Sequence, residues 1–216
     1  MSATLASQLA QVTQKLEAEA PKEIKETLLS AKAEIEQSFD PKRAIQPGAK
    51  LPQFNLPDAT GKVQSSSDLL AKGPLLITFY RGEWCPFCNL ALRALQLRLP
   101  EIEAKGVTLV AVSPELPDTS LSTVDKNELK FPVLSDVGLK FARELGIVWK
   151  QPEALRPVLA GFGTDLKARN GDDSFEVPIP TTILVDRRGT VRNVHAEPDY
   201  FKRLEPQDAL DWIDAL

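Results

Sequence analysis

The sequence is poor in the residues from which metal and redox centres are usually built. Its 216 residues include two cysteines, one histidine and one methionine. A closed zinc site takes four Cys, His or carboxylate ligands, and the chain offers no second cysteine pair. It also has no Gly-rich phosphate loop, and no stretch approaches about 18 consecutive apolar residues. The sequence therefore predicts no cofactor, no metal and no membrane span.

Charge and composition are those of an ordinary globular protein. The net charge is -4, and hydrophobic and charged residues make up 43% and 26% of the chain. An acidic balance argues against nucleic-acid or anionic-membrane partners, because both attract basic patches. The first residues lack a charged segment that leads into an apolar core, so no signal peptide is predicted and we expect a cytoplasmic location. In that reducing compartment a dithiol is cycled rather than used as a structural staple.

The two cysteines, Cys85 and Cys88, lie three residues apart where an apolar strand over residues 74–80 turns into a helix that begins near Pro86. Free backbone N–H groups and the helix dipole stabilise a thiolate there. Thiols in such sites fall in pKa from about 8.5 to roughly 3.5 to 7.5. We therefore expect at least one thiolate at neutral pH. The spacing also lets the two sulfurs close a disulfide, so one cysteine attacks and the other resolves.

Three other uses of this cysteine pair are compatible with its spacing. A structural disulfide across so short a loop removes little entropy from the unfolded chain. The pair is half of a zinc site, but His195 is the only histidine available to complete it. An iron–sulfur cluster shared across a dimer, with ligands from outside the chain, is also compatible with two thiolates per chain. A metal or iron–sulfur binding module without turnover therefore remains the alternative to redox catalysis.

The chain divides into an N-terminal helical hairpin over residues 1–45 and a main domain over residues 46–216. Apolar residues recur at helical spacing in both hairpin helices, which indicates packing on the main domain or, alternatively, a homodimer interface. Strands and helices then alternate, which predicts an α/β sheet covered by helices on both faces. Residues 150–178 show little periodicity, and we interpret them as a loop-rich insertion.

Further elements follow from local patterns. The helix after Pro86 has an apolar face that includes Leu97, and Pro100 is expected to interrupt it. Asp186 is interpreted as a turn residue of a β-hairpin. The other predicted strands are residues 107–112, 131–134, 183–186 and 191–194, and the other predicted helices are residues 120–129, 139–145 and 205–216.

From about residue 48 onward the chain resembles the peroxiredoxin-like proteins of the alkyl hydroperoxide reductase and thiol-specific antioxidant (AhpC/TSA) family. The resemblance implies a thioredoxin-like fold, a hydroperoxide or disulfide substrate, and electrons from a thioredoxin- or glutathione-type donor. The segments that carry it are PQFNLPD at 52–58, FYRGEWCPFC at 79–88, FPVLSD at 131–136 and IPTTILVD at 179–186.

The peroxiredoxin pattern places Cys88 at the peroxidatic position. It expects a Thr where this chain has Cys85, a Pro where it has Arg81, and an Arg where it has Pro180. In peroxiredoxins those groups hydrogen-bond the thiolate and the peroxide oxygens. Their absence should weaken fast peroxide reduction unless Arg81 substitutes for the missing arginine in space.

A thioredoxin or glutaredoxin pattern assigns the roles differently. Pro180 and Thr181 resemble the cis-proline loop that those proteins set beside their dithiol, although a trans proline at the start of an edge strand is the alternative. In that arrangement an exposed Cys85 attacks and Cys88 resolves. The two templates therefore disagree about which cysteine is the nucleophile.

The remaining candidates support the dithiol. Arg81 either stabilises the thiolate or binds an anionic group of the substrate; alternatively, it is a solvated charge at the end of the strand. Trp84 is interpreted as a packing residue that shields the dithiol. His195 is interpreted as a structural or surface histidine. We predict a cysteine-based antioxidant oxidoreductase that cycles the Cys85–Cys88 dithiol and its disulfide, as a thiol peroxidase or a thiol-disulfide reductase.

Overall fold

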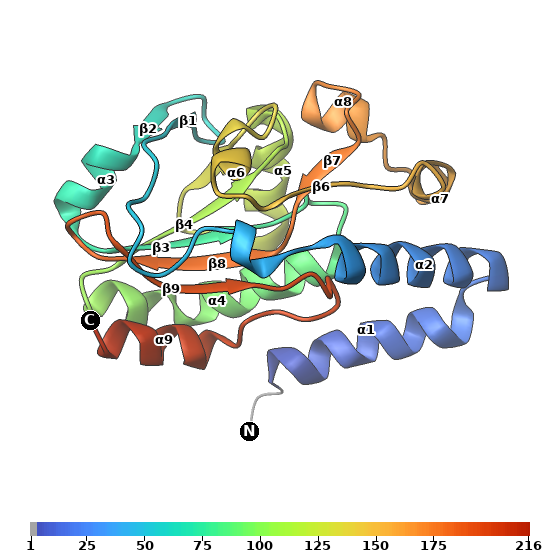
Figure 1. Cartoon of the computed structure of the whole chain (residues 1–216), viewed down its shortest axis with the longest axis horizontal. Coiled ribbons are helices and arrows are strands. Elements are labelled where there is room, and N and C mark those ends of the chain that lie inside the picture. Colours follow the sequence, from blue (N-terminus) through green and yellow to red (C-terminus); the bar gives the residue numbers. More distant parts are fainter. Residues whose placement is uncertain (1–3) are drawn as a thin grey trace.

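A five-stranded mixed sheet forms the centre of the molecule (Figure 1). The structure is a computed structural model and describes residues 4–216. The strand order is β5-β4-β3-β8-β9; β3 runs parallel to β4 and antiparallel to β8. This arrangement confirms the predicted α/β class. The strands are β3 (Leu75–Phe79), β4 (Thr108–Ser113), β5 (Val133–Ser135), β8 (Thr181–Val185) and β9 (Val191–Ala196).

Strand β3 lies in the middle because both of its faces are apolar. Leu75 and Ile77 point into one core and Leu76 into the other, and all three are fully buried. A strand with near-continuous apolar residues is stable only where helices cover both faces of the sheet. β3 therefore ends at Phe79 deep in the molecule, and the segment after it carries the dithiol.

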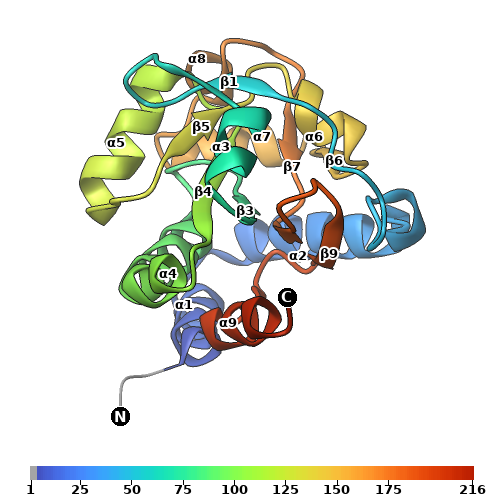
Figure 2. The same ribbon diagram turned by 90° about the vertical axis from the view of Figure 1, so that its left-hand side faces the viewer.

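Helices lie on both faces of the sheet (Figure 2). On one face lie α4 (Pro86–Ala104) and α9 (Pro206–Asp214), and on the other lie α3 (Ser66–Lys72) and α6 (Lys140–Glu144). Helix α5 (Pro117–Asn127) packs beside β5. None of the helices in residues 4–216 is both long and apolar enough to cross a membrane.

Helix α4 departs from the prediction in two ways. It continues through Pro100 to Ala104, and Leu97 is 78% exposed rather than part of the apolar face. Proline removes only one helical hydrogen bond, and the last turn is held by Leu99 and Ile102, which are buried against the sheet. The buried stripe follows spacings of three and four residues, which leaves Leu97 on the solvent side.

The segment interpreted as a loop-rich insertion contains regular structure. Two short helices, α7 and α8, form within it, and its end pairs with the preceding residues as a two-stranded sheet. Each element is too short to produce a recognisable periodicity, which explains why the sequence pattern missed them. The elements of this segment are α7 (Leu155–Gly161), α8 (Leu166–Asn170), β6 (Val148–Lys150) and β7 (Glu176–Pro178). Elsewhere, the remaining small elements are the 3-10 helix η1 (Pro41–Arg43) and a hairpin of β1 (Asn55–Pro57) and β2 (Val63–Ser65).

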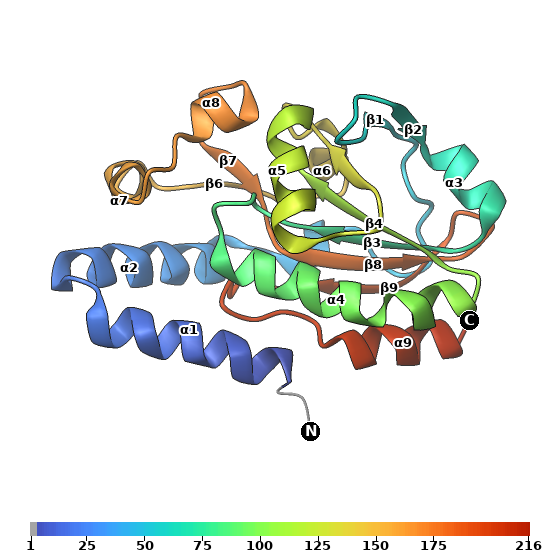
Figure 3. The ribbon, with the colours of Figure 1, turned by 180° about the vertical axis from the view of Figure 1, so that it is seen from behind.

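The N-terminal helices α1 (Leu5–Glu19) and α2 (Lys22–Ser38) lie side by side as a hairpin (Figures 1 and 3). Helix α1 packs against α4, and the Glu205 carboxylate accepts hydrogen bonds from the first backbone N–H groups of α1. The Tyr200 hydroxyl donates to the carbonyl of Leu28 in α2 at 2.9 Å. The hairpin therefore lies at the end of the molecule where α4 begins; its role as a dimer interface stays a prediction.

Candidate active site

The dithiol lies at the N-terminus of α4, directly after β3 and a five-residue loop. Cys85 is the N-cap residue, and its sulfur accepts a hydrogen bond from the backbone N–H of Cys88 at 3.4 Å. Pro86 follows at the first helical position, where no N–H donor is required. The sequence pattern therefore places both sulfurs correctly at a helix start.

Both cysteines are free thiols and both are completely buried, with 0% exposure. The expectation of an exposed Cys85 is therefore wrong. The physical reason is packing that the local pattern does not reveal: Cys85, Cys88 and Phe87 belong to one buried apolar cluster, and Phe201 packs against it and stacks on Phe87 with ring centroids 4.8 Å apart. A reactant reaches the sulfurs only through a cavity or after this packing moves.

Each sulfur accepts a hydrogen bond from one arginine. Arg81 Nη2 lies 3.2 Å from the Cys85 sulfur, and Arg203 Nη2 lies 3.3 Å from the Cys88 sulfur. The Arg81 guanidinium is buried over the ring of Tyr200, 4.2 Å from the centroid. Burial alone lowers the pKa of Arg81, but the two sulfurs outweigh it and raise the pKa above its ordinary value, so Arg81 stays charged.

The pKa values of the two thiols shift in opposite directions. Burial raises the pKa of both thiols. The hydrogen bond between them raises the pKa of Cys85 further and lowers the pKa of Cys88. The pKa of Cys88 is held well below its ordinary value by the hydrogen bond from the Cys85 thiol, by the guanidiniums of Arg203 and Arg81, and by the backbone N–H of Arg81. The pKa of Cys85 is raised well above its ordinary value. Of the two thiols, Cys88 is therefore the one whose pKa is lowered and Cys85 the one whose pKa is raised.

A buried ionic network supports the loop before the dithiol. The Glu115 carboxylate, which is completely buried, accepts a hydrogen bond from the backbone N–H of Glu83 at 2.9 Å. Arg169 of α8 bonds Glu115 at 3.0 Å and the Glu83 carboxylate at 2.9 Å, and Lys126 pairs with Glu83. Burial raises the pKa of Glu115 to about 7. The network connects the dithiol loop to the inserted segment.

A cavity of about 430 Å³ lies against the dithiol loop; we call it the thiol cavity. Arg81 and Trp84 line it from the loop. The other two walls are apolar and come from outside the sheet, namely from the N-terminal hairpin and from the inserted segment: Leu16, Leu28, Leu155, Leu159 and Phe162. The N-terminal hairpin and residues 150–178 therefore both take part in the surroundings of the dithiol.

The supporting residues expected from the sequence have mixed outcomes. Arg81 and Trp84 lie together, with the guanidinium 5.1 Å from the Trp84 ring centroid. Pro180 is trans, because no peptide bond in residues 4–216 is cis, so the expected cis-proline loop is absent. Thr181 pairs with Phe79 at the end of β3, and its hydroxyl donates to a backbone carbonyl rather than to a sulfur.

Arg203 and Glu115 were missed as site residues. Arg203 lies 115 positions after Cys88, in an irregular segment between β9 and α9, so no motif spacing connects the two. Glu115 follows β4 at the same end of the sheet as Cys85, which is the one signal that could have found it. His195 lies in β9 with its Nε2 buried, and Asp186 accepts turn hydrogen bonds from Arg188 and Thr190 as predicted.

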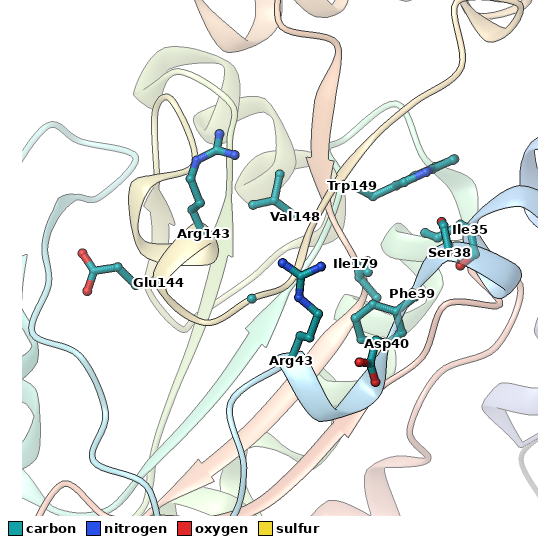
Figure 4. Close-up of a pocket in the computed structure, with 11 residues that line it drawn as sticks. Ile35, Ser38, Phe39, Asp40, Arg43, Arg143, Glu144, Val148, Trp149 and Ile179 are labelled. Atoms are coloured by element: carbon teal, nitrogen blue, oxygen red, sulfur yellow. Dashed lines mark hydrogen bonds between the residues drawn. The ribbon is translucent and has the colours of Figure 1, made fainter.

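A second cavity, of about 420 Å³, lies between the end of α2, η1, α6 and β6 (Figure 4). The guanidinium of Arg43 extends toward the middle of the lining residues, while the Glu144 carboxylate points away (Figure 4). Trp149 on its wall stacks on Tyr200 with centroids 6.2 Å apart, so two aromatic rings separate this cavity from Arg81 and the dithiol. Neither cysteine lines this cavity or the thiol cavity.

Comparison with known proteins places this site in a family. The AhpC/TSA family model matches residues 47–194. The chain belongs to the AhpC/TSA family. It is 31% identical over 155 residues to the thiol-disulfide oxidoreductase ResA of Bacillus cereus, covering 71% of each chain. It is 26% identical over 167 residues to the chloroplastic peroxiredoxin Q of Gentiana triflora, covering 77% of this chain and 64% of that protein.

Solved structures agree on the fold. The peroxidoxin BcpB of Mycobacterium tuberculosis superposes with a TM-score of 0.61 at 20% identity, over 80% of this chain and 98% of that one. As an AhpC/TSA protein with thiol-disulfide oxidoreductase and peroxiredoxin relatives, the chain is a cysteine-based oxidoreductase, and the alternative of a metal-binding module is not favoured. Its chemistry requires a reductant and a peroxide or disulfide substrate.

Proposed function

We propose that the protein is a thiol peroxidase in which Cys88 attacks a hydroperoxide and Cys85 resolves the product. The supporting observation is that both sulfurs are completely buried while each accepts a hydrogen bond from a guanidinium. Attack on a protein disulfide requires the nucleophilic sulfur to align with two sulfurs of a bulky partner. A hydroperoxide presents one small terminal oxygen, which needs less room beside a buried thiolate than a protein disulfide does.

The reaction takes two steps. The Cys88 thiolate attacks the terminal peroxide oxygen, the O–O bond breaks, and the leaving alkoxide takes a proton, which gives Cys88 sulfenic acid and an alcohol or water. The Cys85 thiol then loses its proton and attacks the Cys88 sulfur, which releases water and forms the disulfide. Each peroxide is reduced by two electrons, and the dithiol is oxidised by two.

The arginines supply the charge stabilisation that the family's own residues would provide. Cys85 and Pro180 occupy the positions of the absent Thr and Arg, whereas Arg81 and Arg203 donate directly to the sulfurs. Fixed donors that face developing charge contribute roughly 3 to 4 kcal/mol each to a transition state. Trp84 acts with them as a packing residue that holds the Arg81 guanidinium.

The proposal includes an electron donor and a compartment. A disulfide formed in each turnover has to be reduced by a thioredoxin- or glutathione-type thiol. A dithiol that cycles in this way is suited to a reducing compartment, and we assign the protein to the cytoplasm on that basis.

A rapid-mixing experiment tests the proposed roles. The reduced protein is mixed with hydrogen peroxide and with an organic hydroperoxide, and oxidation is followed by the fluorescence of Trp84 beside the dithiol. We expect oxidation at least about 100-fold faster than that of a free thiolate, the equivalent of about 3 kcal/mol. Cys88→Ser should abolish it, and Cys85→Ser should leave a sulfenic acid that a dimedone-type reagent traps.

Thiol-disulfide reduction is the second candidate function, favoured by the likeness to ResA. It predicts the opposite pattern: slow reaction with both peroxides, rapid reduction of a protein disulfide, and a mixed disulfide trapped on Cys85 in the Cys88→Ser variant. That pattern would refute the peroxidase assignment.

A further inference from the structure

The N-terminal hairpin has few buried contacts with the rest of the molecule. Within residues 5–38, the buried side chains are Leu5 and Leu9 of α1 and Ala31 and Ile35 of α2. A cavity of about 680 Å³ lies between the hairpin and residues 195–203, and the His195 Nε2 is buried there without a partner in the described part of the chain. Segments with few buried apolar contacts open at a low free energy. The hairpin therefore has the features of an element that can detach while the sheet stays folded.

Tyr200 connects this hairpin to both arginines of the dithiol. Its hydroxyl donates to the Leu28 carbonyl of α2 at 2.9 Å. The Arg81 guanidinium lies over its ring, 4.2 Å from the centroid, and its carbonyl accepts a hydrogen bond from Arg203 Nη1 at 2.8 Å. The same two arginines donate to the two sulfurs. A change at the sulfurs is therefore transmitted through two guanidiniums to the one residue that bonds α2.

Oxidation of the dithiol changes what the guanidiniums face. Burial lowers the pKa of Arg81, but the two sulfurs raise it above its ordinary value, so the reduced sulfurs stabilise this cation. A disulfide carries no negative charge. Arg81 is 6% exposed, and its Nε already lacks a partner in the described part of the chain, so the disulfide would leave it a buried cation without an anionic partner. Movement of the guanidinium toward water relieves this cost, and the Tyr200 ring against it has to move as well.

We propose that the N-terminal hairpin is a redox-sensitive lid, closed over the dithiol in the reduced protein and released from Tyr200 when Cys85 and Cys88 form a disulfide. The inference rests on the proposed function only in that this disulfide has to form. The closed arrangement is that of the free thiols, and Leu5 and Leu9 of α1 belong to the same buried cluster as both cysteines. Release of α1 therefore opens this cluster and gives a reducing thiol access to the disulfide.

Hydrogen exchange measures the release directly. The full chain is compared as the dithiol and as the disulfide, which is prepared with diamide; this reagent takes up two electrons and two protons from the thiols, so no peroxide is involved. We expect the backbone amides of α2 to exchange about ten-fold or more faster in the disulfide form, because a detached helix pair loses the contacts that hold it helical. Amides of α3, at the other end of the sheet, should exchange equally in both forms (Figure 1). Unchanged exchange of α2, or faster exchange confined to the first turn of α4, would overturn the inference and leave the peroxidase assignment standing.

Two pairs of variants connect the release to the dithiol. Tyr200→Phe removes the hydroxyl that bonds α2, whereas Tyr80→Phe, at the chain's other tyrosine, removes a hydroxyl that bonds α5. Lys32→Gln breaks the ion pair of 3.3 Å between α2 and Asp199, whereas Lys22→Gln breaks an exposed pair within α2. The first member of each pair loosens the lid, and the second is its matched control.

The variants separate a redox-sensitive lid from a merely structural contact. In the reduced protein Tyr200→Phe and Lys32→Gln should speed exchange of α2 about two- to ten-fold, the effect of one lost hydrogen bond, and the controls should not. Because coupling is reciprocal, the same factor should favour the disulfide over the dithiol in glutathione buffers. In the disulfide form, with the lid already released, neither variant should speed exchange further. Equal acceleration in both redox forms with an unchanged thiol-disulfide equilibrium would refute the lid.

Discussion

Replacing Arg203 by Gln isolates the contribution of one guanidinium to the dithiol. The Arg203 Nη2 donates to the Cys88 sulfur at 3.3 Å, and a hydrogen bond to a charged group contributes about 1.5 to 3 kcal/mol. At 1.36 kcal/mol per unit, the loss should raise the pKa of Cys88 by about 1 to 2. The thiolate exists only in the reduced form, so the same loss should lower the dithiol reduction potential by about 30 to 60 mV.

Two measurements test these values. Thiolate absorbance near 240 nm against pH gives the pKa, and equilibration with glutathione buffers gives the potential. Arg203 also donates to the carbonyls of Tyr200 and Lys202, so the melting temperature has to be recorded as well. Arg203→Lys should recover part of both shifts, and Arg93→Gln, which removes an arginine of α4 that bonds Asn127, should cause neither. An unchanged pKa of Cys88 in Arg203→Gln would refute the assignment of a thiolate held by Arg203.

Two further predictions concern pH and packing. Burial raises the pKa of Glu115 from 4.5 to about 7, so the folded state binds the Glu115 proton more tightly than the unfolded state does. The stability that this proton contributes is lost as pH rises from about 4.5 to 7. Relative to the parent protein, Glu115→Gln should therefore gain about 3 kcal/mol of unfolding free energy across this pH range, as measured by urea unfolding at several pH values. Leu92→Ala should lower the free energy of unfolding by about 2 to 5 kcal/mol because the Leu92 side chain is fully buried. Leu97 is 78% exposed, so Leu97→Ala should change the free energy of unfolding by less than about 0.5 kcal/mol. Equal effects of the two substitutions would contradict the observed buried face of α4.

What could be predicted from the sequence depended on the range of the interaction. The strand over residues 75–79 and the dithiol at the next helix start are set by local apolar runs, proline and capping, which a reader of the sequence can recognise. The burial of Cys85 could not be predicted, because Phe201, which packs against its cluster, lies more than a hundred positions away. Arg203 was missed for the same reason.

The substitution of Cys85 for the family's Thr and the placement of Arg203 are physically connected. In the proposed mechanism the Cys85 thiol donates to Cys88 from the position where the peroxiredoxin pattern expects a Thr hydroxyl, and Arg203 adds a charged donor to the same sulfur. Arg203 closely follows two residues that α2 holds: Tyr200 bonds Leu28 of α2, and Asp199 pairs with Lys32. The N-terminal hairpin therefore does more than cover apolar surface. By holding residues 199 and 200 in place it positions the guanidinium that, in the proposed mechanism, favours Cys88 over Cys85 as the nucleophile.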